Sequence, residues 1–223
     1  HHYMYINCWY AHYRTTETMN NSESEVVSTS PKKTNMQKTK LPSRVILELT
    51  YQCHHKCIFC SSPWNNCDGL YPIREILNWQ KWVEIVDRLV AQGIDHITLS
   101  GGEPLCYDGL WDLVSFISSK HNHINISIIT SAPKSENKNS FIEKCVRYGI
   151  KNISISLPGI STFNSHTATD ETINSPSNVL NWIRSASEKG IHVTTNIPVS
   201  QHNYAELYRI VAMAAIAGTN SFL

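Results

Sequence analysis

The sequence has almost no net charge, because its 19 Lys and Arg residues are balanced by 18 Asp and Glu residues. A nearly neutral chain gives no electrostatic reason to expect nucleic acid or a strongly acidic partner. It also lacks any run near the roughly 18 apolar residues that a membrane-spanning helix needs. We therefore expect a protein that binds neither nucleic acid nor a membrane.

The sequence also lacks the features of a secreted protein. Its first residues do not show the basic and then apolar pattern of a signal peptide. Its seven cysteines are an odd number, whereas a small disulfide-bonded domain usually carries an even set. Three of them lie close together, which favours metal-bound or free thiols in a reducing compartment, and we expect a cytoplasmic protein.

The composition changes near residue 43. Residues 1–42 are rich in Ser, Thr and Asn, so we expect a flexible or otherwise unassigned segment there, although the first ten residues would also suit a short strand. Residues 43–223 carry the apolar patterns of a folded core. The length of 223 residues is enough for one or two domains.

Strand and helix patterns alternate through residues 43–223. The strand patterns are largely apolar on both faces or β-branched, as in buried parallel strands. The helix patterns repeat apolar residues on one face, and Gly93 follows the first of them at the position of a left-handed cap. We predict strands over residues 45–50, 95–100, 124–130, 152–157, 191–198 and 219–223, and helices over residues 79–92, 109–120, 139–148, 177–189 and 204–217.

This alternation favours βαβ units and one parallel sheet in an α/β fold. Two architectures fit, an open doubly wound sheet and a barrel-like arc, and periodicity does not decide between them. In both architectures, the catalytic and ligand-binding residues lie beyond the C-terminal ends of the strands.

Three cysteines, Cys53, Cys57 and Cys60, follow the first strand pattern directly. Thiolate ligands select zinc, copper(I) or an iron–sulfur cluster. A structural zinc site has four ligands, so three thiolates leave one position open for another molecule. Cys67 could complete a four-cysteine zinc site, and this alternative stays open.

The spacing Cys53-x3-Cys57-x2-Cys60, with Phe59 before the third cysteine, resembles the signature of the radical S-adenosylmethionine (SAM) enzymes. A Gly-Gly-Glu-Pro segment at residues 101–104 follows one βα unit later, as it does in that family. The resemblance implies a partial (βα)6 TIM-like barrel as the core over residues 43–223. This chain would hold five βα units and the start of strand six, and would be C-terminally truncated relative to the family core.

The resemblance implies that the three cysteines ligate three irons of a [4Fe–4S] cluster, whose fourth iron binds SAM. The cluster would cleave SAM reductively to a 5′-deoxyadenosyl radical, which abstracts a hydrogen atom from the substrate. The electron would come from a donor such as flavodoxin or ferredoxin. The positions that match the family's SAM contacts are Phe59, Gly101, Gly102, Glu103, Pro104, Ser156 and Asn196.

The residue types at three of these positions, Gly101, Gly102 and Glu103, suggest a physical role for each. The two glycines would let the backbone approach a ligand closely, which a Cβ would block. Glu103 would supply a hydrogen-bonding or structural carboxylate. Cys145 lies on the inward face of its predicted helix, and Cys106 lies near the mouth of the site. We expect both to be small buried apolar residues, with contact to the substrate as the alternative for Cys106.

The resemblance favours a peptide or protein substrate, as in maturases. Two alternatives remain open. One is an enzyme that acts on a small metabolite in cofactor biosynthesis, and the other is a degenerate relative that binds a cluster or zinc without turnover.

Overall fold

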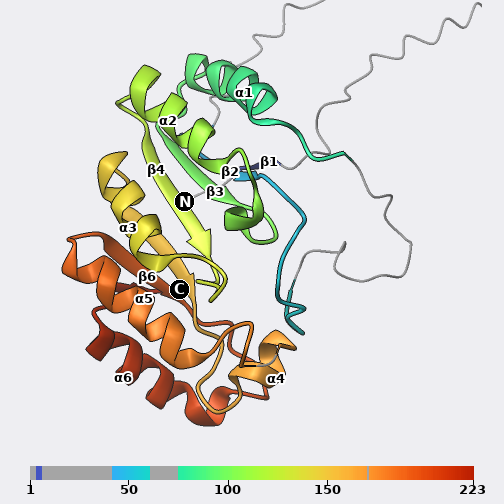
Figure 1. Ribbon diagram of the computed structural model, residues 1–223, viewed down its shortest axis with the longest axis vertical. Coiled ribbons are helices and arrows are strands. Elements are labelled where there is room, and N and C mark those ends of the chain that lie inside the picture. Colours follow the sequence, from blue (N-terminus) through green and yellow to red (C-terminus); the bar gives the residue numbers. More distant parts are fainter. Residues whose placement is uncertain (1–3, 7–41, 61–74, 170) are drawn as a thin grey trace, which may run out of the picture.

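The structure is a computed structural model that describes residues 4–6, 42–60, 75–169 and 171–223. Its strands form one parallel sheet whose spatial order is the chain order, β1 to β7 (Figure 1). The strands are β1 Met4–Ile6, β2 Arg44–Glu48, β3 His96–Ser100, β4 Asn125–Thr130, β5 Asn152–Ser156, β6 His192–Asn196 and β7 Ser221–Phe222.

Helices connect the strands and lie around the outside of the sheet, except for one short helix at the edge where the strands end (Figure 1). The α-helices are α1 Trp79–Ala91, α2 Leu110–Lys120, α3 Lys138–Arg147, α4 Phe163–Thr167, α5 Pro176–Glu188 and α6 Leu207–Ala217. Two 3₁₀ helices, η3 Pro104–Cys106 and η4 Tyr204–Glu206, precede α2 and α6.

The strand order decides between the two architectures. A doubly wound sheet reverses its strand order at a switch point and places helices on both faces. Here each strand pairs with the next in the chain, so successive right-handed crossovers place their helices on one side and the sheet curves into an arc. The expected partial TIM-like barrel is therefore confirmed, and among the described strands β7 does not close onto β1.

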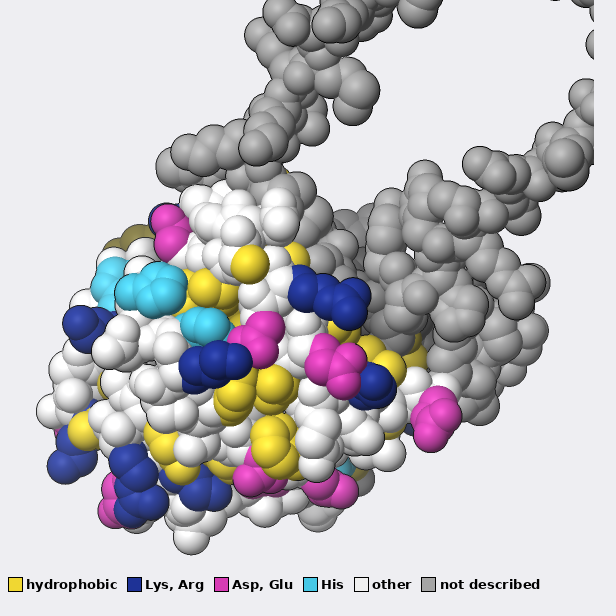
Figure 2. Space-filling view, turned by 90° about the horizontal axis from the view of Figure 1, so that it is seen from above, with side chains coloured by type: hydrophobic (Ala, Val, Ile, Leu, Met, Phe, Trp, Pro, Cys, Tyr) yellow, Lys and Arg dark blue, Asp and Glu magenta, His cyan; other side chains and the backbone are white. Residues whose placement is uncertain are grey.

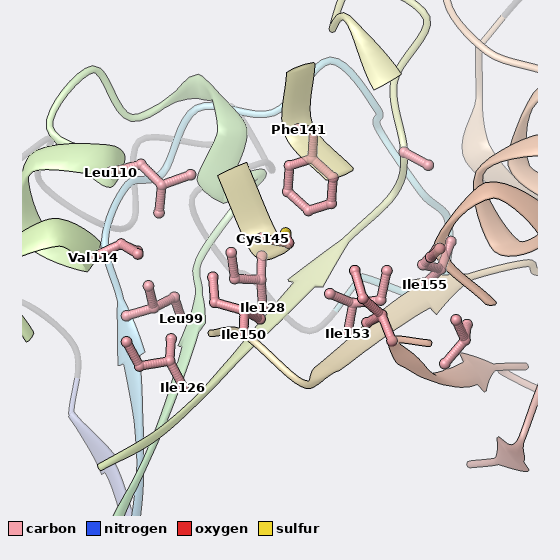
Figure 3. Packing of buried hydrophobic residues seen from close by; sticks show 14 of the residues in the cluster. Leu99, Leu110, Val114, Ile126, Ile128, Phe141, Cys145, Ile150, Ile153 and Ile155 are labelled. Atoms are coloured by element: carbon pink, nitrogen blue, oxygen red, sulfur yellow. The ribbon is translucent and has the colours of Figure 1, made fainter. Parts of the chain in front are cut away.

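The hydrophobic core lies between the convex side of the sheet and the helices. Figure 3 shows Leu99 of β3 and Ile128 of β4 beneath Leu110 of α2 and beside Phe141 and Cys145 of α3. All five side chains are buried. The expectation that Cys145 is a core residue is confirmed.

The concave side of the sheet is more polar than we expected. In β5, Ser154 and Ser156 alternate with the buried residues Ile153 and Ile155, and β6 alternates in the same way. The prediction that the strands are largely apolar on both faces or β-branched is therefore wrong for one face of β5, which carries Ser154 and Ser156. In β6, Val193, Thr194 and Thr195 are β-branched, as predicted. A packed TIM barrel fills its interior with branched apolar side chains, whereas this open arc presents polar groups there.

The predicted strands and long helices agree with the structure to within a few residues, and Gly93 has the expected positive φ of 94°. The predicted helix over residues 204–217 begins as the 3₁₀ helix η4. Helix α4 lies between the predicted strand over residues 152–157 and the predicted helix over residues 177–189, where the sequence predicts no helix. It is too short to show a periodic pattern, and contacts with distant residues hold it.

Figure 2 shows basic and acidic side chains mixed on one face of the molecule. Of the helices within the described ranges, none has the length and apolar character that a membrane crossing requires.

Glu206, in η4, fastens the loop after β5 to the loop after β6. Its carboxylate accepts hydrogen bonds from the backbone N–H groups of Ile160, Ser161 and Thr162 at 2.9–3.1 Å. The hydroxyl groups of Ser161 and Thr162 also donate to it. Burial alone would raise the pKa of Glu206, but these hydrogen bonds outweigh it and lower the pKa from 4.5 to about 2.

This depressed pKa predicts an acid-dependent loss of stability. The ionised carboxylate stabilises the fold fully above pH 4.5, and this contribution disappears as the pH falls from 4.5 towards 2. We expect Glu206→Gln to lower the free energy of unfolding by about 1 kcal/mol at pH 7, allowing for solvent screening. The difference from the wild type should shrink at pH 3 in urea unfolding. A constant difference at both pH values would contradict this account, and Glu188→Gln, an exposed residue on α5, is the control.

Candidate functional site

The cysteine loop begins where β2 and β3 end side by side. Beyond the paired strands, the N–H of Gly102 donates to the carbonyl of Thr50 and the N–H of Glu103 donates to the carbonyl of Gln52, both at 2.7 Å. Cys53 is the next residue. The backbone of the Gly-Gly-Glu-Pro segment therefore fixes the position from which the cysteine loop departs.

The two glycines make this approach possible. A Cβ on Gly101 would lie 2.4 Å from the carbonyl oxygen of Thr50, and one on Gly102 would lie 2.3 Å from that of Gln52. Gly101 also has a φ of +132°, a conformation that residues with a side chain rarely adopt. The described close contacts are with Thr50 and Gln52 of the chain itself. Both glycines also line the pocket described below, and their contact with a ligand stays a prediction.

Glu103 ties β3 to β4. Its carboxylate accepts hydrogen bonds from the hydroxyl of Thr130 at 2.8 Å and from the N–H and hydroxyl of Ser131 at 2.8 and 2.6 Å. Its side chain is only 1% exposed and also accepts from the N–H of Leu105 at the start of η3. Burial raises the pKa of Glu103, while these hydrogen bonds oppose the rise. The oxygens of the carboxylate are therefore already hydrogen-bonded to other residues of the chain. The next residue, Pro104, is buried.

The predicted site residues gather around one pocket of about 150 Å³ at the C-terminal edge of the sheet. The pocket is lined by the three cysteines, by residues of β3 to β5 and by α4. Its lining includes Cys53, Cys57, Cys60, Phe59, Gly101, Gly102 and Ser156. Glu103 and Pro104 are buried behind this lining.

Asn196 lies beside Ser156, since the two residues are paired in the register of β5 and β6. Its side-chain oxygen is buried and has no hydrogen-bond partner among the described residues. A buried acceptor without a partner costs free energy, so such an atom suits a site where a ligand supplies the donor. Asn196 therefore fits the prediction of a ligand contact at this end of β6.

The environment of the cysteines favours protonated thiols before a metal binds. Burial, with nearby negative groups, raises the pKa of Cys53 to about 11 and that of Cys57 to about 12. Iron must therefore displace protons when it binds these two residues. Cys60 is exposed at the other side of the loop.

A single metal ion and an iron–sulfur cluster make different demands on the three cysteines. Within the described ranges, no three His, Cys, Asp or Glu side chains converge on a point where one metal ion could sit. A [4Fe–4S] cluster has a different requirement, because each thiolate binds a separate iron. Cys67, the candidate fourth zinc ligand, lies outside the described residues.

The structure gives roles to residues whose roles the sequence leaves open or does not indicate. His55, between the first two cysteines, is buried, and burial lowers its pKa to about 4. Its ring meets Phe163 of α4 edge to face, with centroids 6.4 Å apart. Helix α4 also supplies Thr167 to the pocket lining. No pattern in the sequence connects α4 with a loop more than 100 residues earlier.

Cys106 corrects another expectation. It is half-buried, and its sulfur lies 3.3 Å from Nε2 of His54 at the mouth of the site. The prediction of a small buried apolar residue is therefore wrong for Cys106. The 3₁₀ helix η3 turns this side chain towards the cysteine loop instead of the core.

Comparison with known families gives the family to which the chain belongs. The model of the Radical SAM superfamily matches residues 47–214, which contain both motifs. The chain belongs to the radical SAM superfamily. The family implies a [4Fe–4S] cluster and SAM as cofactors.

Curated relatives resemble the chain over most of its length. The sporulation killing factor maturation protein SkfB of Bacillus subtilis (strain 168) is 27% identical over 82% of this chain and 42% of its own length. The PqqA peptide cyclase of Granulibacter bethesdensis is 25% identical over 79% and 45%. The GTP 3′,8-cyclase of Aquifex aeolicus is 25% identical over 72% and 49%. The chain thus spans less than half the length of these relatives.

Solved structures share the fold. The crystal structure of Streptococcus suis SuiB bound to S-adenosylmethionine has a TM-score of 0.67 at 17% identity, covering 82% of this chain and 40% of SuiB. The structure of anSMEcpe with bound AdoMet has a TM-score of 0.64 at 15% identity, covering 80% and 49%. At these identities the likeness supports the fold alone.

The glycine contacts predict a specific defect. Gly102→Ala places a Cβ against the carbonyl of Gln52, so the start of the cysteine loop must move. After anaerobic addition of iron and sulfide, we expect the iron bound per chain to fall about tenfold. Gly149→Ala is the control, because its Cβ would meet open space although φ is +70°. A Gly102→Ala chain that binds as much iron as the wild type would contradict this role.

Proposed function

We propose that this chain is the catalytic core of a radical SAM enzyme that modifies a peptide or protein. The observation that carries the proposal is the gathering of three cysteines and the Gly-Gly-Glu-Pro backbone around one pocket at the C-terminal edge of the sheet. This edge is where catalytic residues lie in parallel α/β barrels. The unpartnered oxygen of Asn196 in the same region supports it.

The residues present fit the cofactors that the family implies. Cys53, Cys57 and Cys60 would each hold one iron and leave the fourth iron for SAM. When bound, the cluster and SAM supply the one-electron cleavage that yields a 5′-deoxyadenosyl radical. A flavodoxin- or ferredoxin-type donor would provide the electron. The protein's own task is to position the reactants and exclude water.

The chain's residues divide this task. Phe59 lines the pocket, and its partly exposed ring lies against His166 of α4 with ring centroids 6.1 Å apart, so it would form one wall of the pocket. Ser156 and Asn196 would hydrogen-bond polar groups of SAM. Glu103 would hold the ends of β3 and β4 in place instead of contacting SAM, because Thr130 and Ser131 occupy its oxygens.

The names of the relatives support a peptide substrate. They include a maturation protein and a peptide cyclase, and one solved neighbour is SuiB bound to its precursor peptide SuiA. A GTP 3′,8-cyclase is also a relative, so action on a nucleotide is the competing function. The open, polar concave face is compatible with a substrate that enters from the mouth of the arc.

The cofactor assignment is tested by one pair of variants. After anaerobic reconstitution and reduction, the wild type should form 5′-deoxyadenosine and methionine from SAM. Cys57→Ala should lose at least about 100-fold in this rate, because one iron loses its thiolate. Cys145→Ala, a buried cysteine on α3, should keep the activity. Equal rates in Cys57→Ala and the wild type would exclude Cys57 as a ligand.

The substrate class is tested by isotope transfer. A pool of ribosomally made precursor peptides, deuterated at carbon, should pass deuterium into 5′-deoxyadenosine, because the radical takes its hydrogen from the substrate. Carbon-deuterated GTP should pass none. Mass spectrometry of 5′-deoxyadenosine measures both, and deuterium from GTP but not from the peptides would favour the nucleotide function instead.

A further inference from the structure

Helix α4 holds the cysteine loop by its backbone. The N–H of Lys56 donates to the carbonyl of Thr167, and the N–H of Ile58 donates to the carbonyl of His166, each at 3.0 Å. These two groups flank Cys57 on both sides. Figure 1 shows α4 apart from the other helices, beside the end of the segment that follows β2. The orientation of Cys57 therefore depends on the position of α4.

Helix α4 has little stability of its own. It contains five residues, far fewer than the length at which isolated helices become stable. The side chain of Thr162, its N-cap residue, makes no capping hydrogen bond. Its position must therefore come from the residues that contact it.

The loop between β6 and α6 supplies polar contacts of this kind, in addition to the packing of Phe163 of α4 in the hydrophobic core. The carboxylate of Glu206 gathers three successive backbone N–H groups and two hydroxyl groups just before α4. The hydroxyl of Ser200 lies 3.0 Å from Nε2 of His166, which is a fully buried residue of α4. Asn203, also fully buried, donates to the carbonyl of Pro158 at 2.7 Å and accepts from the N–H of Ser200 at 2.8 Å.

We propose that Glu206 is a positioning residue for the cluster, and that it acts through α4 on the loop around Cys57. This inference rests on the proposed function. Glu206 does not line the pocket, whereas Phe163 and Thr167 of α4 do. Its carboxylate fixes the start of α4, and the last carbonyls of α4 fix the N–H groups beside Cys57.

The arrangement also restricts the hydrogen bonds available to the cluster. Because the N–H groups of Lys56 and Ile58 donate to carbonyls of α4, they would not be available to donate to the sulfur atoms of a cluster held by the cysteines. If α4 moves away, these two groups become free to donate to cluster sulfur, and more water reaches the pocket. Both changes stabilise the more negative reduced cluster and raise its midpoint potential.

The test compares three variants with the wild type after anaerobic reconstitution. Glu206→Gln replaces one acceptor oxygen with an amide that faces donors. Ser200→Ala removes one hydroxyl and keeps the carboxylate. Glu188→Gln is the matched control, since its side chain is exposed and makes no ion pair among the described residues. The readouts are the midpoint potential of the cluster and the apparent Kd of SAM, both followed by electron paramagnetic resonance.

We expect Glu206→Gln to raise the midpoint potential and to weaken SAM binding about tenfold, the usual lower range for residues that orient metal ligands. Ser200→Ala should shift the midpoint potential and the apparent Kd of SAM in the same direction, by smaller amounts. If Glu206→Gln does not fold, Ser200→Ala tests whether the position of α4 controls these two quantities. Glu188→Gln should match the wild type. Circular dichroism establishes that each chain is folded.

The outcomes separate the two proposals. Folded Glu206→Gln and Ser200→Ala chains with the wild-type potential and SAM affinity would overturn the inference about Glu206 alone. A wild-type chain that assembles no cluster would overturn the proposed function, and the inference with it.

Discussion

The site depends on the close approach of two backbone segments beyond the ends of β2 and β3. Two hydrogen bonds of 2.7 Å join residues 102 and 103 to residues 50 and 52, immediately before Cys53. Residues with a Cβ at positions 101 and 102 would collide with carbonyl oxygens at this distance. The start of the cysteine loop is therefore set by backbone geometry, and both sequence motifs belong to one structural unit.

The part of the cysteine loop around Cys57 is held by α4, which follows β5. The sheet curves, so the segment after β5 returns to the segment after β2, and α4 binds the backbone on both sides of Cys57. Glu103 links the ends of β3 and β4 between these two supports. The pocket thus has contributions from the cysteine loop after β2, from β3 to β5 and from α4, and its geometry depends on the curvature of the whole sheet.

The sequence predicts the features that depend on local patterns of residues. Periodicity places the long helices and the strands, and the cysteine spacing with residues 101–104 identifies the site, because the C-terminal ends of parallel strands share one edge. It does not predict α4, whose five residues are held by groups far away in the chain. It also does not show that Glu103 is occupied by Thr130 and Ser131, or that Ser154 and Ser156 face a polar interior. These features depend on how strands curve and pair, which local patterns do not encode.

The most direct test of the central claim is electron–nuclear double resonance of the reduced protein with SAM labelled with ¹⁵N at its amino group. If three cysteines hold three irons and leave the fourth open, the spectrum should contain a ¹⁵N coupling from SAM bound to that iron. The coupling should replace the ¹⁴N coupling of unlabelled SAM. A reduced cluster that shows no ¹⁵N coupling with saturating SAM would contradict the account.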